Sequence, residues 1–544
     1  MTSTHRHVED LVSRFDRPRA CAAELLCDRH ADDAVAFTVV EPDLSWHDWT
    51  FGELRARSAR LATALAELGA GPGDRVATLL GKSAELVVTV LAIWRIGAVH
   101  VPLFTALAPP AIATRLDGSG ARIVVTEPAQ RAKLGPNEDI PAAWRLTVIT
   151  TGAAGDQHPG DHPFDRLLAA PPQPVPVAMG GDATLVELYT SGTTGPAKGV
   201  PVPLWAVSSM LVYQEFGLDH QESDVFWNAA DPGWAYGLYH AILGPLGLGR
   251  RSLLVHSGFS VALTWAVLAA FRVTNFTAGP TVYRALRAAD DQAPPGLALR
   301  HCSSAGEPLP PEVSDWAERV LGVPVFDHYG QTELGMAVAN AWHPDLRADR
   351  PRGSMGRALP GWRLEALRPE SAEPAAEGER GRLAVDLAAS PLMWFTGYRG
   401  APGRTAERFT PDRRWYLTGD TAAKDADGNF HFTARDDDII LMAGYRIGPS
   451  EVESVLLTHP AVAEAAVVGV PDDLRGEVVA AHVVVRPGRD AGPELAEELQ
   501  TLVKTRFAAH AYPRIVHFVP ELPKTPSGKL RRSALRYAER RSRN

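Results

Sequence analysis

The sequence predicts an α/β protein, in which a large N-terminal domain of parallel-type sheets with packed helices precedes a small α+β C-terminal domain. Three observations predict this class. The 544 residues exceed what one hydrophobic core usually supports. Strand-like apolar runs alternate with helix-period segments through the N-terminal part, as in βα units. After about residue 436 the pattern changes to a compact unit, so we expect domains at 1–436 and 437–544.

The N-terminal elements follow the spacing of apolar residues. Leucines at helical spacing (Leu54, Leu61, Leu65) precede a strand-like run at 75–80. The apolar run 86–94 stops far short of the roughly 20 residues that span a bilayer, so we expect a buried helix and no membrane span. Further along we expect a strand at 252–255, a helix at 261–271 and a strand at 274–278.

The C-terminal elements are marked by their ends. Residues 450–457 open like a helix with Ser450 as N-cap and an acidic first turn. Strands are expected at 463–470 and 477–485. The unit has about 110 residues, a size typical of an independent domain. The proline-rich residues 171–176 predict a surface linker that leads into the next strand.

Composition narrows the class of protein. A net charge of -9 argues against a nucleic-acid partner, and we interpret the locally basic tail, residues 531–543, as a solvated helix end. Residues 1–19 carry charges throughout and have no apolar h-region, so no secretory signal is expected. Three scattered cysteines are too few for a disulfide framework or a zinc site. We expect a cytoplasmic protein, and nothing indicates its oligomeric state.

A Gly/Ser/Thr-rich segment follows the strand expected at 183–189. Glycines let a backbone approach an anion closely, hydroxyls and N–H groups donate to phosphate oxygens, and lysine adds a point charge. A Walker A loop is excluded because Ala197 precedes Lys198 and Gly199 follows it. An ordinary surface loop is the alternative. The phosphate-loop residues are Thr190, Ser191, Gly192, Thr193, Thr194, Gly195 and Lys198.

Four further segments follow the loop in order. They are Tyr329-Gly330-Gln331-Thr332-Glu333, Tyr416-Leu417-Thr418-Gly419-Asp420, the stretch from Arg435-Asp436-Asp437 to Gly444-Tyr445-Arg446, and Pro523 to Lys529. With the loop, these ordered motifs resemble the adenylate-forming superfamily of acyl-CoA synthetases, aryl-acid ligases, nonribosomal adenylation domains and luciferases. The resemblance covers about residues 45–535.

The resemblance implies an ATP site. Thr332 would donate to phosphate and Glu333 would hold Mg²⁺, while Asp420 and Arg435 would reach the ribose hydroxyls. Outside this context, Thr332 and Glu333 would be a surface or capping pair. The other nucleotide-binding positions that it implies, beyond the loop, are Gly306, Glu307, Pro308, Asp327, His328, Tyr329, Gly330 and Gln331, with Tyr329 stacked on the base or, alternatively, a core aromatic.

The resemblance also implies that the small domain is mobile. Lys529 would bridge carboxylate and phosphate during adenylation, and rotation about Asp437 would then replace it with the CoA segment Gly444-Tyr445. Arg446 belongs to that exchanged segment and is a further catalytic candidate. In isolation, a lysine in a Pro/Ser/Gly loop would simply be solvated.

Asp231-Pro232-Gly233-Trp234 resembles a segment of the short- and medium-chain acyl-CoA synthetases. The acyl-pocket positions that this implies are Trp234, Ala235, Tyr236, Ala305 and Gly330. Acetate-specific members carry a tryptophan at the position of Gly330, so we expect an open floor and an acid bulkier than acetate, such as a medium-chain or aromatic acid. Nothing resembles the aspartate that binds an amino group in amino-acid adenylation domains.

The resemblance therefore predicts an acid–thiol ligase that uses ATP, Mg²⁺ and CoA. One alternative is a ligase that loads a carrier protein, or an enzyme that performs only one half-reaction. A non-catalytic nucleotide-binding regulator is an alternative of another class. The presence of Lys529, Glu333 and Asp420 argues against the regulator, because a binder needs no bridging lysine.

Overall fold

The computed structural model describes residues 3–152, 158–173, 175–190, 197–349, 351–435, 438–442, 445–472, 476–506, 511–525 and 529–543. The chain forms two compact units: Met1–Arg363 with Asp386–Glu407, and Leu364–Val385 with Arg408–Asn544. The second unit takes in a sheet that precedes residue 436. The domain boundary at 436/437 stays a prediction, because both residues lie outside the described ones.

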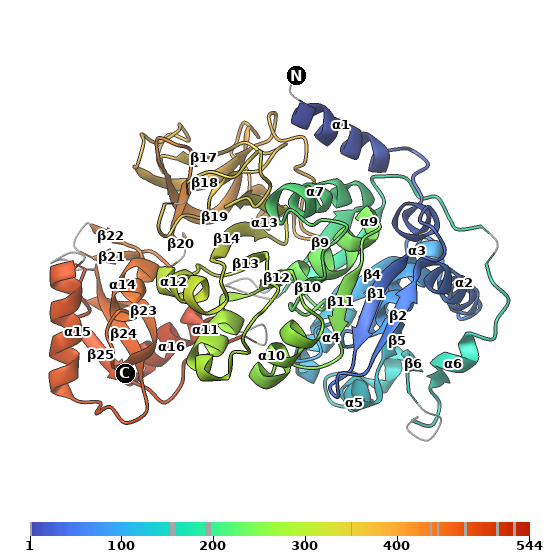
Figure 1. The fold of residues 1–544 in the computed structure, drawn as a ribbon, viewed down its shortest axis with the longest axis horizontal. Coiled ribbons are helices and arrows are strands. Elements are labelled where there is room, and N and C mark those ends of the chain that lie inside the picture. Colours follow the sequence, from blue (N-terminus) through green and yellow to red (C-terminus); the bar gives the residue numbers. More distant parts are fainter. Residues whose placement is uncertain are drawn as a thin grey trace. The chain divides into compact units, whose positions relative to one another are not determined.

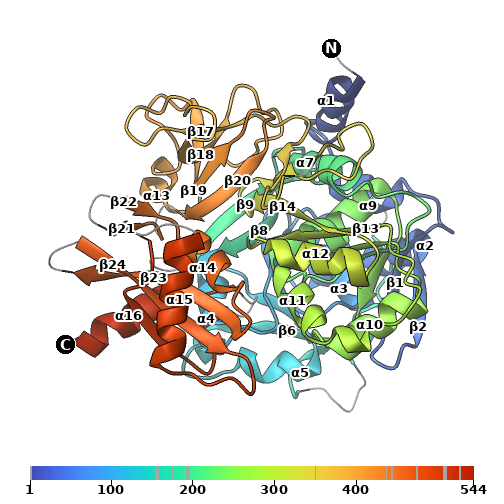
Figure 2. The ribbon, with the colours of Figure 1, turned by 60° about the vertical axis from the view of Figure 1, so that its left-hand side comes forward.

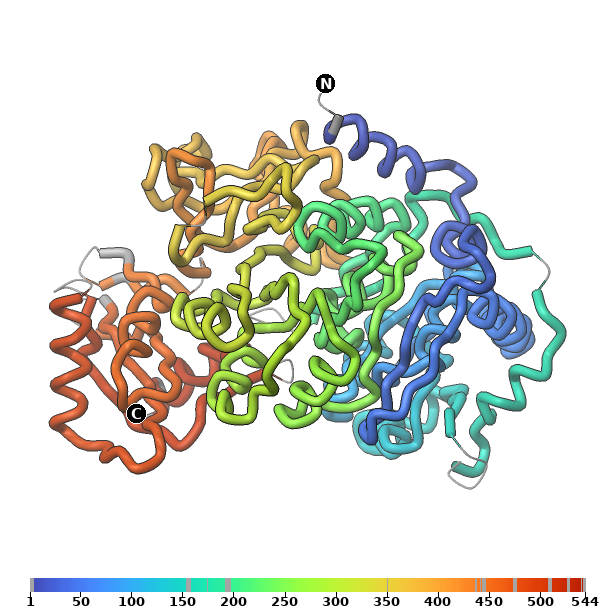
Figure 3. The backbone as a smooth tube through the Cα atoms, in the orientation of Figure 1, coloured from blue at the N-terminus to red at the C-terminus, as the bar shows by residue number. Residues whose placement is uncertain are grey.

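The first unit contains two sheets, and the larger has nine strands among the described residues. Its order is β16-β15-β14-β13-β12-β10-β11-β1-β2, parallel from β14 to β1 and antiparallel at both edges. The strands are β1 Val35–Val40, β2 Trp46–Thr50, β10 Phe226–Asn228, β11 Ser252–Val255, β12 Asn275–Ala278, β13 His301–Ala305, β14 Val325–Gln331, β15 Gly335–Ala339 and β16 Arg357–Ala358. The tube in Figure 3 shows how this sheet places the blue β1 segment beside the green β11 segment.

The second sheet of this unit has seven described strands in the order β7-β6-β5-β3-β4-β8-β9, of which only the β8–β9 pair is antiparallel. The strands are β3 Arg75–Leu79, β4 Val99–Pro102, β5 Ile123–Thr126, β6 Thr147–Thr150, β7 His162–Pro163, β8 Thr184–Thr190 and β9 Lys198–Pro203. Mainly parallel pairing places several strand ends at one edge, where α/β proteins commonly bind ligands.

Helices of the first unit bury the faces of both sheets. They are α1 Ser3–Phe15, α2 Phe51–Glu67, α3 Ala84–Arg95, α4 Pro109–Ser119, α5 Pro128–Arg131, α6 Phe164–Leu167, α7 Val207–Val212, α8 Ala235–Gly237, α9 Gly244–Leu248, α10 Val261–Ala270, α11 Pro280–Ala288, α12 Pro311–Val320 and α13 Pro402–Ala406. Figure 1 shows helices α10, α11 and α12 beside strands β10 to β13, and side chains of these elements form one apolar core. Such burial is the main source of fold stability.

The predicted N-terminal elements are confirmed. The run 86–94 lies in α3, whose residues are all buried except Glu85. The helix begins after Ser83, whose hydroxyl accepts a hydrogen bond from the Leu86 N–H. The strands expected at 75–80, 183–189, 252–255 and 274–278 are β3, β8, β11 and β12, and the helix expected at 261–271 is α10. Among the described residues no helix is both long and apolar enough to cross a membrane.

The second unit contains a four-stranded sheet and a five-stranded sheet within its described residues. The first consists of β17 Leu364–Leu367, β18 Arg380–Asp386, β19 Trp415–Lys424 and β20 Phe430–Arg435. The second consists of β21 Ile440–Met442, β22 Tyr445–Ile447, β23 Val462–Asp472, β24 Gly476–Val485 and β25 Ile515–Phe518, with helices α14 Pro449–Leu456, α15 Pro493–Arg506 and α16 Arg532–Arg543. Figure 2 labels helices α14 and α15 and strands β23 and β24. Side chains of these elements share one apolar core. The strands predicted at 463–470 and 477–485 are confirmed as β23 and β24.

Two expectations for this unit are wrong. Ser450 is not the N-cap of α14, because the helix begins one residue earlier at Pro449, whose preset φ suits the first helical position, and Gly448 is the cap. The basic tail is not simply solvated either. Arg532 donates to both Glu453 oxygens, at 2.7 and 2.8 Å, and Arg536 donates to Asp438 at 2.6 Å, so the start of α16 is anchored by ion pairs.

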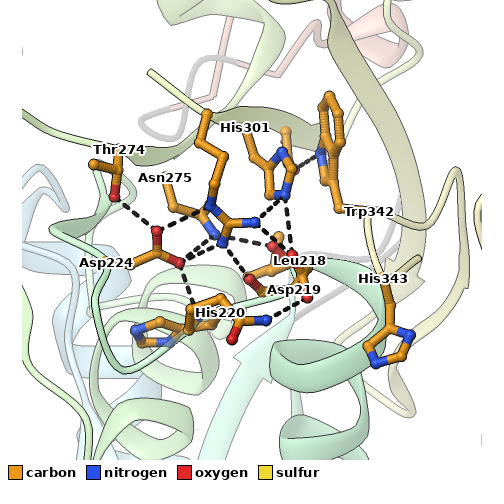
Figure 4. A network of polar contacts seen from close by, with 12 residues as sticks. Leu218, Asp219, His220, Asp224, Thr274, Asn275, His301, Trp342 and His343 are labelled. Carbon is orange, nitrogen blue, oxygen red and sulfur yellow. Dashed lines mark hydrogen bonds and ion pairs between the residues drawn. The ribbon is translucent and has the colours of Figure 1, made fainter. Parts of the chain in front are cut away.

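A charged network lies before the first residues of β12 and β13 (Figure 4). Arg300 donates to Asp224 at 2.6 Å and also contacts Asp219, and Thr274 donates to Asp224 at 2.7 Å. Burial alone would raise the pKa of both aspartates, but hydrogen bonds from Arg300 lower it below the usual value. The network ties the segment around residues 219–224 to the beginning of both strands.

The three cysteines, Cys21, Cys27 and Cys302, are buried and form no disulfide, as the sequence predicts. Burial raises the pKa of Cys27 and of Cys302 to about 12, and also raises the pKa of Cys21. All three therefore remain protonated thiols at neutral pH.

Candidate active site

The predicted phosphate loop connects two antiparallel neighbours. Thr190 ends β8, Lys198 begins β9, and the two residues are directly paired across the strands. A Walker A loop instead joins a strand to a helix, so this geometry agrees with the exclusion made from the sequence. Ser191, Gly192, Thr193, Thr194 and Gly195 lie outside the described residues, and their phosphate-binding role stays a prediction.

One tyrosine links the end of this loop to the predicted metal carboxylate. The hydroxyl of Tyr398 donates to Oε1 of Glu333 at 2.7 Å. The ammonium Nζ of Lys198 lies 4.8 Å from the centroid of the Tyr398 ring, within the range of a cation–π contact. The structure therefore brings together Lys198 and Glu333, two of the residues that the motifs single out, through a third residue that they do not include.

Glu187 holds the segment that carries this tyrosine. This buried carboxylate accepts hydrogen bonds from Tyr189 at 2.8 Å, from Arg399 at 3.2 Å and from Arg75 at 3.3 Å. The Arg399 N–H also donates to the Gly199 carbonyl at 2.9 Å. Residues 398–399 are thus attached to both strands that flank the phosphate loop.

The surroundings of Glu333 fit a hard cation. Its side chain is 7% exposed, Oε1 is held by Tyr398, and Oε2 accepts no hydrogen bond from any described residue. Mg²⁺ prefers oxygen ligands and is commonly bound by one or two carboxylates together with phosphate oxygens and water. Tyr239 donates to the Thr332 carbonyl at 3.0 Å, so the backbone beside Glu333 is also held. Burial and the nearby Glu333 charge raise the pKa of Tyr239 well above its usual value, so this donor stays protonated.

The segments predicted to surround adenine are neighbours in the large sheet. Strands β13 and β14 pair in parallel, with Ser304 opposite Asp327 and Ala305 opposite His328. Gly306 follows β13 with φ of 100°, a backbone conformation that glycine adopts readily. Glu307 is paired with Arg284 at 3.2 Å, and Pro308 is exposed. Tyr329 is buried at 8% exposure, so burial alone does not separate a stacking role from a core role.

Asp327 is a buried carboxylic acid without a cationic partner among the described residues. The Leu309 N–H donates to Oδ2 at 3.2 Å, and Oδ1 is buried without a described partner. Burial raises the pKa of Asp327 to about 8. A neutral acid at this position can donate as well as accept a hydrogen bond.

A chain of buried hydrogen bonds lies behind the predicted acyl-pocket residue Tyr236. Its hydroxyl is 2.9 Å from that of Tyr213, which is 2.8 Å from Nδ1 of His328. Nε2 of His328 donates to the Asn340 carbonyl at 3.1 Å, so Nδ1 accepts from Tyr213. Burial lowers the pKa of His328 to about 3, which keeps the ring neutral. Trp234 and Ala235 precede Tyr236 and are partly exposed, whereas Ala305 is buried.

Gly330 is a close-packing position. A Cβ atom there would lie 2.1 Å from the Gly335 carbonyl oxygen and 2.8 Å from Cα of Met336, both on the paired strand β15. A side chain therefore has no space in this structure without movement of that strand. The absence of an indole at this residue does not by itself leave open space, and the glycine is needed for strand pairing whether or not its backbone faces the acid.

In the second unit, Asp420 and Arg435 are opposite each other on β19 and β20. Arg435 Nη1 lies 3.5 Å from Asp420 Oδ1, and the Asp420 N–H donates to the Thr418 hydroxyl at 3.1 Å. Asp420 is 4% exposed. The two residues implied for the ribose are therefore a cross-strand pair, and the sequence motifs that contain them meet through sheet register.

The remaining predicted residues are only partly described. Lys529 is exposed. Its carbonyl accepts a hydrogen bond from the Thr525 N–H at 2.7 Å, and its N–H donates to the Thr525 hydroxyl at 3.0 Å. Tyr445 and Arg446 form the start of β22. Asp437 and Gly444 lie outside the described residues. The hinge, CoA and catalytic roles of these positions stay predictions.

The motifs did not include Tyr398, Arg399, Glu187 or Tyr213. No local pattern indicates their contacts, because the partners are far apart in the chain, at separations of 65 residues for Tyr398 and Glu333 and 212 for Arg399 and Glu187. Only Gly397-Tyr398-Arg399-Gly400, a tyrosine–arginine pair between two glycines, is a local signal that marks a constrained turn.

Comparison with known proteins agrees with this geometry. Residues 25–397 match the family model described as "AMP-binding enzyme", and residues 451–529 match its C-terminal domain. The acetyl-coenzyme A synthetase of Bacillus subtilis is 34% identical over 533 residues, which cover 95% of this chain and 90% of that protein. The Brucella canis acyl-CoA synthetase structure is 44% identical, with a TM-score of 0.75 and coverage of 98% and 99%. The anthranilate CoA ligase AuaEII, solved with anthranoyl-AMP, is 26% identical, with a TM-score of 0.86 and coverage of 97% and 98%.

Proposed function

Because this chain belongs to the AMP-binding enzyme family and is an acid–thiol ligase of the acyl-CoA synthetase type, we propose that it converts an acid bulkier than acetate into its CoA thioester. In the first step the acid carboxylate attacks the α-phosphate of ATP, which forms acyl-AMP and releases pyrophosphate. In the second step the CoA thiol attacks the acyl carbonyl and AMP leaves.

The contact from Lys198 through Tyr398 to Glu333 carries this proposal. It places a cation and an oriented carboxylate together where β9 begins, beside the loop that would hold the phosphates. When bound, Mg²⁺ would neutralise charge on the phosphate oxygens. Glu333 would hold it, Thr332 and the loop hydroxyls would donate to phosphate, and Lys198 would add positive charge at the loop's end.

The nucleoside would be bound by residues of the motifs that contain Tyr329, Asp420 and Arg435. Asp420 offers two carboxylate oxygens as acceptors for ribose hydroxyls, and Arg435 would orient that carboxylate. Tyr329 would stack on adenine, with Gly306 and Glu307 beside the base. Lys529 would bridge the acid and the phosphate in the first step only, and rotation about Asp437 would bring Gly444, Tyr445 and Arg446 to CoA for the second.

The nature of the acid has weaker support. Relatives are named for acids as different as acetate and anthranilate, so family membership leaves a range of sizes. The small side chains of Ala235 and Ala305 support a medium-chain or aromatic acid. Trp234 and Tyr236 would supply flat apolar walls.

A panel of acids tests the proposal. Pyrophosphate release is measured for acetate, octanoate, benzoate and related acids, with and without CoA. We expect release that depends on the acid, is accelerated by CoA, and is larger for an acid bulkier than acetate. Acid-dependent release without thioester formation on CoA would favour a carrier-protein acceptor or a single half-reaction. No release with any acid would contradict adenylation.

A further inference from the structure

Resting on the function proposed above, we infer that Tyr398 is a positioning residue that orients the Glu333 carboxylate toward Mg²⁺ and couples it to Lys198. Its hydroxyl bonds to Oε1 of Glu333 at 2.7 Å, and its ring lies 4.8 Å from Nζ of Lys198. One side chain thus contacts both charged groups that the phosphates of ATP would meet in this unit.

The hydrogen bond selects one orientation of a flexible carboxylate. Glutamate rotates about three side-chain bonds, so an unsupported carboxylate would lose conformational entropy on binding a cation. Tyr398 occupies Oε1, and Oε2 has no hydrogen-bond partner among the described residues, which leaves that oxygen to bind a cation. Residues that support metal ligands in this way commonly matter nearly as much as the ligands themselves.

The backbone on either side of Tyr398 is held in turn. Its own N–H donates to the Thr405 hydroxyl at 2.9 Å, and the next residue, Arg399, is bonded to the Gly199 carbonyl and to Glu187. The tyrosine is 5% exposed. Since Gly199 follows Lys198, the hydrogen bond from the Arg399 N–H links the segment of Tyr398 to the beginning of β9.

The alternative is a tyrosine that only fills the core. A core role would affect stability and would leave the metal dependence of ATP binding unchanged. The test therefore needs a measurement of metal dependence that does not rely on turnover.

Tyr398→Phe removes the hydroxyl and keeps the ring beside Lys198. Tyr189→Phe is the matched control, because it also removes a tyrosine hydroxyl bonded to a buried glutamate, at 2.8 Å, but at Glu187. ATP binding is measured by equilibrium dialysis over a range of Mg²⁺ concentrations and in EDTA. Mg²⁺ is expected to enhance ATP binding. For Tyr398→Phe we expect the Mg²⁺ concentration that gives half of this enhancement to rise by about 10-fold or more, with ATP affinity in EDTA unchanged.

Tyr189→Phe is expected to keep the Mg²⁺ dependence of the parent. Tyr398→Leu, which also removes the ring, should additionally weaken ATP binding in EDTA by roughly 2- to 5-fold, through the lost contact with Lys198. If Tyr398→Phe fails to fold, Arg399→Ala releases the segment while leaving the hydroxyl, and should shift the Mg²⁺ dependence in the same direction.

Equal Mg²⁺ dependence in a folded Tyr398→Phe variant and the parent would overturn the inference. An equal shift of the Mg²⁺ dependence in Tyr398→Phe and Tyr189→Phe would also overturn the inference, because the effect would then not be specific to Glu333. Failure of the proposed function is distinguishable, since the parent itself would then release no pyrophosphate with any acid.

Discussion

Two regions of the nine-stranded sheet differ in whether their buried carboxyl groups have a cationic partner. One region precedes strands β12 and β13, and the other lies toward the carboxyl ends of the parallel strands. Before the strands, Asp219 and Asp224 share the cation of Arg300, and hydrogen bonds from it hold their pKa values below the usual range despite burial. Toward the carboxyl ends, Asp327 has no described cationic partner, and burial raises its pKa to about 8.

The difference separates two uses of buried polar groups. A paired network satisfies its own charges and needs no ligand, so it serves the fold. An unbalanced carboxyl group costs free energy in the absence of a partner, and such groups concentrate where ligands bind. Asp327 and Glu333 both lie near the end at which the ATP residues are proposed. The comparison predicts that removing the cation of the paired network lowers stability, whereas removing the charge of Glu333 impairs binding and catalysis.

The largest expected effect is on catalysis at the carboxyl end. Glu333→Gln keeps the size of the side chain but removes the charge that would hold Mg²⁺. We expect kcat/KM for pyrophosphate release to fall by about 10²- to 10³-fold, with no loss in the free energy of unfolding. Steady-state kinetics and urea denaturation measure the two quantities. A destabilised Glu333→Gln variant would break the comparison, because the charge would then be serving the fold.

The next effect is on stability at the other end. Arg300→Met leaves Asp219 and Asp224 buried without their cation and should lower the free energy of unfolding by about 3 kcal/mol. KM for ATP should be unchanged in the folded enzyme. Arg300→Met combined with Asp219→Asn and Asp224→Asn is the control, and should recover part of the loss. Parent-like denaturation of Arg300→Met would show that the network contributes little.

A glycine at the carboxyl end sharpens the comparison, because it is expected to act on the fold. Gly330→Ala forces a Cβ atom against the backbone of β15 and should cost about 1–3 kcal/mol of stability. Gly279→Ala is the matched control at the carboxyl end of β12, where the nearest atom to an added Cβ is 3.9 Å away. Equal stability of the two variants would show that β15 moves aside, and would restore Gly330 as a site where a side chain can enter.

The last effect is gradual and concerns pH. Because the pKa of folded Asp327 is about 8, the group keeps its proton up to about that pH, whereas the unfolded group loses it near its ordinary pKa of 3.8. The folded state therefore binds more protons between these values, and stability falls as pH rises through that window, by roughly 1 kcal/mol per pH unit. Asp327→Asn should remove this decline.

Asp219 and Asp224 have the opposite sign. Their folded pKa values lie below the unfolded value, so their contribution to stability is present above about pH 4 and is lost as pH falls through the folded values.

Urea denaturation of the parent and Asp327→Asn from pH 5 to pH 8.5, without ATP, measures the pH dependence of stability that Asp327 causes. Parallel curves for the two proteins would contradict the assignment for Asp327.

Local sequence patterns predicted the strands and helices, but most contacts between residues far apart in the sequence could not be predicted from them. Apolar runs of strand length predicted β3, β8, β11 and β12, and the motif residues Asp420 and Arg435 do meet across β19 and β20. The partner of Glu333 could not be predicted, because Tyr398 lies 65 residues away in the sequence and meets it only in the folded chain.

The two errors in the second unit have physical reasons of the same kind. Ser450 is a good cap by type, but Pro449 already has the φ of a first helical residue, so the helix begins there. The arginine-rich composition of the tail indicated a solvated helix end. Arg532 instead forms an ion pair with Glu453, which lies 79 residues away in the sequence. The expectation for Gly330 failed for a related reason. The sequence shows that this residue has no side chain, but not that the backbone of β15 already occupies the space where one would lie.

The three buried cysteines have a practical consequence for testing the proposed rotation with fluorescent dyes. Protonated, enclosed thiols react slowly with maleimides, so the native chain should take up little label. Two cysteines introduced at exposed glutamates, such as Glu318 of α12 in the first unit and Glu497 of α15 in the second, would then be the dominant labelling sites. A donor–acceptor dye pair on those helices could report single-molecule distances during turnover without removal of any native residue.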